Sequence, residues 1–92
     1  MKFKDYVFQH QRRRFRLRIY PYATAVKIFM DDLLRDVSVA DGSKHVLDFF
    51  FRDDRNNQHR VHVERKTKGF KYHYLVYFDQ QLIYQTSENN PA

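Results

Sequence analysis

The chain of 92 residues has no cysteine and no tryptophan, and it has only two glycines and two prolines. Without cysteine it can form neither disulfides nor thiolate metal sites, and it has no thiol nucleophile. No apolar run approaches the roughly 20 residues that span a bilayer. The first residues also lack the apolar core of a secretion signal. We therefore expect a cytoplasmic protein without a membrane partner.

Positive charge is concentrated near the N-terminus. The net charge is +6, and the first 20 residues hold seven Lys and Arg but only one Asp. Residues 21–57 hold five Lys and Arg and seven Asp. This asymmetry predicts an oriented charged surface rather than evenly spread solubilising charge. Length and composition predict a single domain over residues 1–85, followed by a flexible polar tail over residues 86–92.

Arginines and apolar residues alternate from Arg12 to Ile19, which predicts an amphipathic β-strand because successive side chains on a strand point to opposite faces. Phe15, Leu17 and Ile19 would form the apolar face. Guanidinium groups roughly 6.6 Å apart would line the other face. Such groups bind phosphate and carboxylate through paired hydrogen bonds, so the pattern favours a polyanionic partner. An edge strand whose charges prevent aggregation is the alternative interpretation. The four arginines of this face are Arg12, Arg14, Arg16 and Arg18.

Residues 24–37 have the spacing of an amphipathic helix, with apolar side chains recurring three and four residues apart. Thr24 is a suitable N-cap, and Asp41–Ser43 would form the exit turn. With strands elsewhere, the sequence predicts an α+β domain, in which an antiparallel sheet of about five strands carries one amphipathic helix on one face. The apolar positions of the helix are Val26, Phe29, Met30, Leu33, Leu34 and Val37.

Four strands are predicted in the C-terminal half. Residues 46–52 form an aromatic apolar block that favours a strand, with a helix starting near Ser43 as the competing interpretation. Residues 53–57 have the composition of a hairpin loop, and a meander is expected over residues 58–66, 70–78 and 82–85. The strand over 70–78 is apolar on both faces near its end, whereas one helix covers one face. The N-terminal segment or a second copy must cover the other, so a homodimer is a reasonable expectation.

The loop of the hairpin formed by residues 58–66 and 70–78 leaves two registers open. A three-residue loop would expose Tyr72 and Tyr74 beside basic side chains, a platform typical of single-stranded nucleic-acid binders. A two- or four-residue loop exchanges the faces, buries both tyrosines and places Glu64 opposite Lys71. We favour the second register because it pairs opposite charges and sets aromatic residues beside β-branched ones.

The sequence contains no catalytic constellation. It has no glycine-rich phosphate loop, nucleophile elbow or HExxH motif, and its neighbouring aspartates fall on the predicted helix or in a loop rather than in a cleft. In the favoured register His62 and His73 would be cross-strand neighbours near Glu64, a set that could hold a transition metal, although solvated histidines are commoner. We expect a non-enzymatic protein with neither metal nor cofactor.

These features predict a small basic nucleic-acid-binding protein, or an accessory protein of a nucleic-acid complex. It would contact the phosphate backbone of DNA or RNA with little sequence specificity. The alternative is a non-catalytic protein-interaction module whose arginine strand docks on an acidic partner surface. The predicted contact residues are Arg12, Arg14, Arg16 and Arg18, extended by Arg60, Lys66, Lys68 and Lys71.

Overall fold

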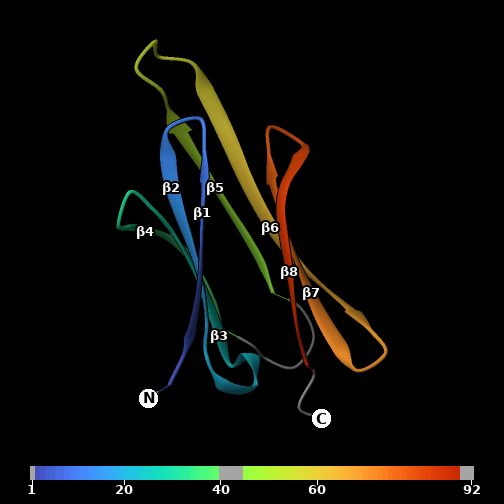
Figure 1. Ribbon diagram of the computed structural model, residues 1–92. Coiled ribbons are helices and arrows are strands. Elements are labelled where there is room, and N and C mark those ends of the chain that lie inside the picture. Colours follow the sequence, from blue (N-terminus) through green and yellow to red (C-terminus); the bar gives the residue numbers. More distant parts are fainter. Residues whose placement is uncertain (1, 40–44, 90–92) are drawn as a thin grey trace.

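The computed structural model describes residues 2–39 and 45–89, and its strands form two antiparallel sheets (Figure 1). Sheet A has the order β1-β2-β3-β4 and sheet B the order β5-β6-β7-β8, so each sheet is a meander. A 3₁₀ turn, η1 (Pro21–Ala23), joins β2 to β3. The strands are β1 Lys4–His10, β2 Arg13–Ile19, β3 Ala25–Met30, β4 Leu33–Val39, β5 Val46–Arg52, β6 Gln58–Lys68, β7 Lys71–Phe78 and β8 Gln81–Asn89.

The predicted helix over residues 24–37 is wrong, and with it the α+β fold, because this segment forms the β3–β4 hairpin. Within the residues that the structure describes, η1 is the only helical segment. Val26, Ile28 and Met30 alternate with more exposed residues, as on a strand that buries one face. Asp31 and Asp32 then adopt φ values of 51° and 67°. Two consecutive left-handed residues form a tight hairpin turn and end any helix.

The six positions that fitted a helical stripe divide between the two faces of sheet A. Val26 and Met30 are buried, whereas Leu33, Leu34 and Val37 are exposed. Strand and helix periods place many of the same residues together over a short window, so the apolar pattern alone does not separate them. The segment forms a strand and not a helix because β3 pairs with β2, whose apolar face is turned towards the core.

The core lies between the two sheets, and alternate residues of the central strands fill it, as in a β-sandwich. Phe15 and Leu17 from sheet A and Leu47, Val61 and Tyr74 from sheet B have no exposed surface. Full burial of an aliphatic side chain of this size stabilises the fold by about 1.5–3 kcal/mol. The inner face of sheet B is therefore covered by sheet A, which includes the segment that the sequence predicted to cover it as a helix.

Side chains close both gaps between the sheets. Between β1 and β8, the rings of Phe8 and Tyr84 stack with their centroids 4.2 Å apart. Near β4 and β5, the buried His45 donates from Nε2 to the carbonyl oxygen of Ala23 at 2.6 Å, and its Nδ1 lies 2.8 Å from the hydroxyl of Ser38. These contacts fix the two sheets against each other at both edges.

The predicted strand over residues 46–52 is confirmed, as is the meander that follows it. In the β6–β7 hairpin, the division of faces is confirmed, because Val61 and Val63 share the inner face with the fully buried Tyr74. The expected pairing of Glu64 with Lys71 is wrong, since Glu64 lies opposite Leu75. The two loop residues are Gly69 and Phe70, whereas pairing of Glu64 with Lys71 would have required a loop centred on residues 67 and 68. Glycine suits the observed loop because it readily takes the φ of 62° found at Gly69.

Some predicted features extend into residues outside the described ranges. The exit turn at Asp41–Ser43 and the last three residues of the expected tail, Asn90–Ala92, lie there. Within the described part, β8 continues past Gln85 to Asn89 and pairs with β7 throughout. The described residues contain no helix long and apolar enough to cross a membrane.

Candidate nucleic-acid interface

Three of the four arginines predicted on one strand face do lie together. Arg14, Arg16 and Arg18 are on β2, on the face opposite the buried Phe15 and Leu17, and we call them the arginine row. Arg12 does not belong to it, because it has a φ of 67° in the β1–β2 turn. The alternation of the sequence therefore predicts the direction of this row correctly but overestimates its length.

Two carboxylates neutralise most of the arginine row. Asp5 on β1 lies opposite Arg18 and accepts hydrogen bonds from Nε and Nη2 of its guanidinium at 2.8 and 3.1 Å. The same carboxylate is 3.7 Å from Arg16 Nε. Asp32, in the β3–β4 turn, binds Arg14 and lies 3.7 Å from Arg16 Nη2. Three cations thus face two anions, so the row presents a far weaker positive field than the sequence predicts.

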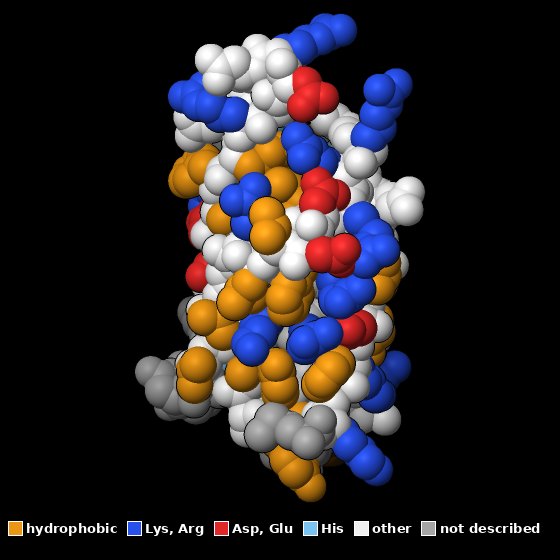
Figure 2. Space-filling model, turned by 90° about the vertical axis from the view of Figure 1, so that its left-hand side faces the viewer, with side chains coloured by type: hydrophobic (Ala, Val, Ile, Leu, Met, Phe, Trp, Pro, Cys, Tyr) orange, Lys and Arg blue, Asp and Glu red, His pale blue; other side chains and the backbone are white. Residues whose placement is uncertain are grey.

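The surface of this side of the molecule is correspondingly mixed. Figure 2 shows the side that lies on the left in Figure 1, where blue, red and orange side chains are interspersed without an unbroken cationic band. The guanidinium of Arg18 also lies 3.9 Å from the ring centroid of Phe3. The exposed ion pair of Arg14 with Asp32 contributes only about 0–1 kcal/mol, so a ligand can compete for Arg14. It must nevertheless displace a carboxylate to do so.

The predicted residues of sheet B lie on the opposite side of the sandwich. Arg60 and Lys66 point outward from β6, away from sheet A. Arg60 donates from Nε to Asp48 at 2.8 Å, which lowers the pKa of Asp48, and Lys66 lies 3.6 Å from Glu64. The structure therefore does not join these residues to the arginine row in one surface.

A different arrangement is found at the tip of the β6–β7 hairpin. Lys68 and Lys71 lie directly opposite each other, and Phe70 between them is 82% exposed. Within the described residues neither lysine has a carboxylate oxygen within 4.0 Å. Nearby, the guanidinium of Arg65 stacks 4.2 Å from the ring centroid of Tyr72. Cations without acidic neighbours and accessible rings thus occur together at this tip.

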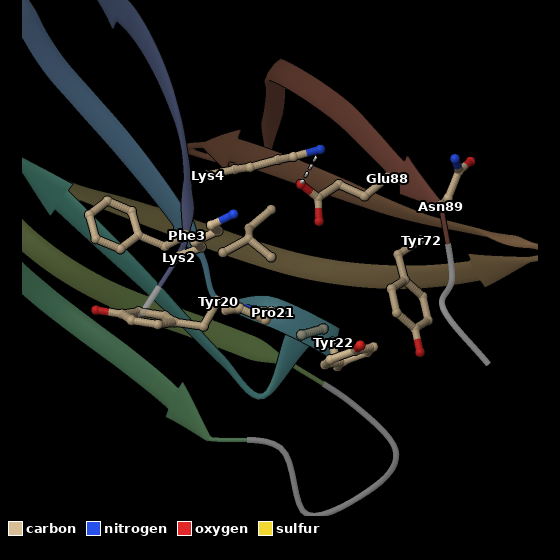
Figure 3. A pocket seen from close by; sticks show the side chains of 11 residues that line it. Lys2, Phe3, Lys4, Tyr20, Pro21, Tyr22, Tyr72, Glu88 and Asn89 are labelled. Carbon is tan, nitrogen blue, oxygen red and sulfur yellow. Dashed lines mark ion pairs between the residues drawn. The ribbon is translucent and has the colours of Figure 1, made fainter.

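A cavity of about 470 Å³ opens at the same end of the sandwich. It lies between the β2–β3 connection and the adjoining ends of β1, β7 and β8 (Figure 3). Its aromatic lining comes from both halves of the sandwich, with Phe3 and Tyr20 towards one end of the cavity and Tyr22 and Tyr72 towards the other. Tyr22 is 77% exposed and has a left-handed φ of 59°. We call this part of the molecule, with the cavity and the β6–β7 tip, the tyrosine end.

The charged groups of the cavity are paired with each other. Glu88 accepts a hydrogen bond from Tyr6 Oη at 2.8 Å and lies 4.0 Å from Lys4 Nζ. Burial, followed by this hydrogen bond, raises the pKa of Tyr6 to about 12. Lys2 also lines the cavity, so two lysines outnumber one carboxylate among the described residues that line it. Lys27 lowers the pKa of Tyr20 by hydrogen bonding. The cavity is therefore aromatic with a slight positive charge.

The histidines make ion pairs and polar contacts. His62 lies opposite Tyr77 instead of His73, and its ring nitrogens contact Asp48 and Glu64 at 3.2 and 3.4 Å. No group of three or more His, Cys, Asp or Glu among the described residues could hold a metal ion. At the end away from the cavity, His59 bridges Asp79 and Asp53, each at 2.7 Å. These bonds raise the pKa of His59, and that of Asp53 falls to about 2.

The cavity residues were not among the predicted contact residues. Tyr20-Pro21-Tyr22 places two aromatic side chains around a strand-ending proline, which was the available signal. A proline after a strand indicates only where that strand ends, because it cannot donate to the sheet. The cavity also needs Tyr72 and Glu88, which lie at least 50 residues further along the chain.

Comparison with known proteins identifies no relative. No protein-family model matches the chain, and neither a curated protein nor a solved structure matches it.

Proposed function

We propose that this is a small basic protein that binds nucleic acid through the phosphate backbone with little sequence specificity, and that the tyrosine end makes the contact. The observation that carries the proposal is the pair Lys68 and Lys71, which face each other beside the exposed Phe70. In contrast, the arginine row is largely occupied by Asp5 and Asp32. We therefore place the main phosphate contact at the hairpin tip, whereas the sequence favoured the arginine row.

The physical basis is the release of counterions. Each lysine that neutralises a phosphate releases condensed cations, which favours binding at low salt. Lys68 and Lys71 need not break an ion pair within the described residues before they reach a phosphate, whereas Arg14 and Arg18 must each leave a carboxylate. Sequence discrimination is expected to be weak, because lysines that contact phosphate groups carry no information about the base sequence.

The test compares two double variants that lose the same charge. Lys68→Ser/Lys71→Ser removes the two lysines of the β6–β7 tip, and Arg12→Ser/Arg55→Ser removes two cations from the opposite end of the sandwich (Figure 1). Binding of a fluorescent single-stranded oligonucleotide is measured by anisotropy at about 50 and 200 mM salt. The lysine variant should bind much more weakly than the arginine variant. Equal loss in both variants would contradict placement at the tyrosine end, and no binding by the parent at low salt would contradict the function.

A second candidate function is docking on an acidic protein surface, which the outer face of sheet A favours. Val37 and Val39 on β4 are 45% and 71% exposed, and they share this face with the arginine row. In this case the carboxylates of a partner would replace Asp5 and Asp32 around the arginines. Failure of the parent to bind oligonucleotides, together with retention of an acidic protein that Val37→Ser/Val39→Ser no longer retains, would favour this function.

Location and assembly are proposals of the same kind. The absence of cysteine supports a reducing compartment such as the cytoplasm. A homodimer is supported by the exposed apolar side chains of β4.

A further inference from the structure

The cavity at the tyrosine end has the size and the lining of a small-ligand site. Its volume of about 470 Å³ falls within the range of ligand pockets, roughly 300–1,000 Å³. Its walls are aromatic and come from both halves of the sandwich, so two different elements, η1 and β7, bring Tyr22 and Tyr72 to the same end of the cavity (Figure 3). Aromatic rings stack with other flat rings, and one face of Tyr72 is already covered by the guanidinium of Arg65.

The charges of the cavity restrict the kind of ligand. An organic cation is disfavoured, because Lys2 and Lys4 line the cavity and Glu88, the one carboxylate among its described lining residues, is already bonded to Tyr6 and paired with Lys4. A ligand with a flat ring and a nearby negative charge fits both the aromatic walls and the lysines. A nucleotide has these two properties in adjacent parts of one molecule.

We propose that the cavity takes one unpaired base of a single strand, stacked on Tyr22 and Tyr72, while the neighbouring phosphates lie against Lys2 and Lys4. The inference rests on the proposed function and adds a base-binding site to it. Lys71 pairs with Asn89, which lines the cavity, so the same strand can continue from the cavity to the lysines of the hairpin tip. A paired base in a duplex cannot enter, because its ring faces are covered by its neighbours.

The exposed ring of Tyr22 supports this assignment. The side chain of Tyr22 is 77% exposed, so a ligand can cover it without displacing other side chains. In η1 its backbone has a left-handed conformation, which costs about 1–2 kcal/mol for an L-residue other than glycine. The backbone here is fixed by hydrogen bonds from Ala23 N to Tyr20 O at 2.9 Å and from Thr24 N to Pro21 O at 3.2 Å. The ring is therefore presented at the mouth of the cavity before any ligand arrives.

The experiment separates base contacts from phosphate contacts. A fluorescent thymidylate strand of roughly ten nucleotides is compared with an abasic strand of the same length, which keeps the phosphates but has no bases. Tyr22→Asn removes the ring and keeps the left-handed backbone, since asparagine tolerates it. Tyr22→Phe restores the ring, and Phe50→Ser removes an aromatic ring that is 57% exposed outside the cavity. Thermal melting checks that each variant is folded.

The parent should bind the thymidylate strand about 5- to 100-fold more tightly than the abasic strand, as expected for stacking of a base on aromatic rings. Tyr22→Asn should lose this preference without weaker binding of the abasic strand, whereas Tyr22→Phe and Phe50→Ser should keep it. Equal affinity of the parent for both strands, or an unchanged preference in Tyr22→Asn, overturns the base site while leaving phosphate binding intact. Absence of binding to both strands at low salt overturns the proposed function and the base site together.

Discussion

Asp32 should act as an internal competitor of phosphate, and its removal should strengthen nucleic-acid binding. Its carboxylate binds Arg14 and lies 3.7 Å from Arg16. The Asp32→Asn variant removes the negative charge with almost no change of shape. Its backbone φ of 67° suits asparagine, which adopts left-handed conformations readily. The substitution therefore uncovers two arginines while the β3–β4 turn is kept.

The size of the effect follows from the number of arginines released. Arg14 loses its only carboxylate within the described residues, and Arg16 keeps Asp5 at 3.7 Å. One to two additional phosphate contacts are therefore expected. For a single strand the logarithm of the binding constant falls by roughly 0.7 per contact for each unit in the logarithm of salt concentration, so the slope should steepen by about one. The free energy of unfolding should fall by no more than about 1 kcal/mol, because the lost ion pairs are exposed.

The assay is a salt titration of oligonucleotide binding for the parent, Asp32→Asn and the control Asp54→Asn. Asp54 is fully exposed and comes no nearer than 4.0 Å to Arg13, so the control makes the same change of net charge away from the arginine row. Asp32→Asn should show the steeper slope and the higher affinity at low salt. Identical titrations of the two variants would refute the reasoning that Asp32 masks the arginine row.

Three further predictions concern stability. Hydrogen bonds to two carboxylates raise the pKa of His59. The contribution of His59 to the free energy of unfolding is therefore complete below about pH 6.5 and is lost as the pH rises through the raised pKa. The contribution of Asp53, whose pKa is about 2, is present above about pH 3.8 and is lost as the pH falls towards 2. Melting temperatures should therefore be highest between these limits, and His59→Gln should flatten the alkaline side; an unchanged alkaline side would contradict the bridge. Gln80→Gly should increase the free energy of unfolding by about 0.5–1 kcal/mol, because φ is 70° there and glycine relieves the strain; lower stability in urea would oppose this. Leu17→Ala should cost about 2–5 kcal/mol in the same assay and Val39→Ala less than about 0.5 kcal/mol, and similar costs would contradict the assignment of the core.

The strands were predictable where apolar and polar residues alternate with a period of two and do not also fit the helical period. The alternation in residues 13–19 gave both the strand and the direction of its arginines, and the buried side of β6 and β7 followed from matching side chains across the hairpin. The helix prediction failed because residues 26–37 satisfy both periods, and only the turn at Asp31 and Asp32 separates them. An Asp-Asp turn without glycine is a weak signal in a sequence, although both residues adopt left-handed conformations in the structure.

The candidate site was less predictable than the fold because it depends on distant parts of the chain. Asp5 reaches Arg18 through strand pairing, and Asp32 reaches Arg14 and Arg16 from a turn that the sequence placed in a helix. The neutralisation of the arginine row could therefore not be seen from residues 12–20. The cavity likewise forms only when segments from both sheets meet, with Tyr72 among them.

The most direct test of the contact surface is an amide chemical-shift titration of the ¹⁵N-labelled protein with a single-stranded thymidylate oligonucleotide. If the tyrosine end binds the strand, the largest shifts should fall on residues 20–24 and 66–73, while the amides of Arg14, Arg16 and Arg18 stay nearly unchanged. Shifts centred on those three arginines, with residues 66–73 unaffected, would show that the arginine row binds nucleic acid despite its carboxylates.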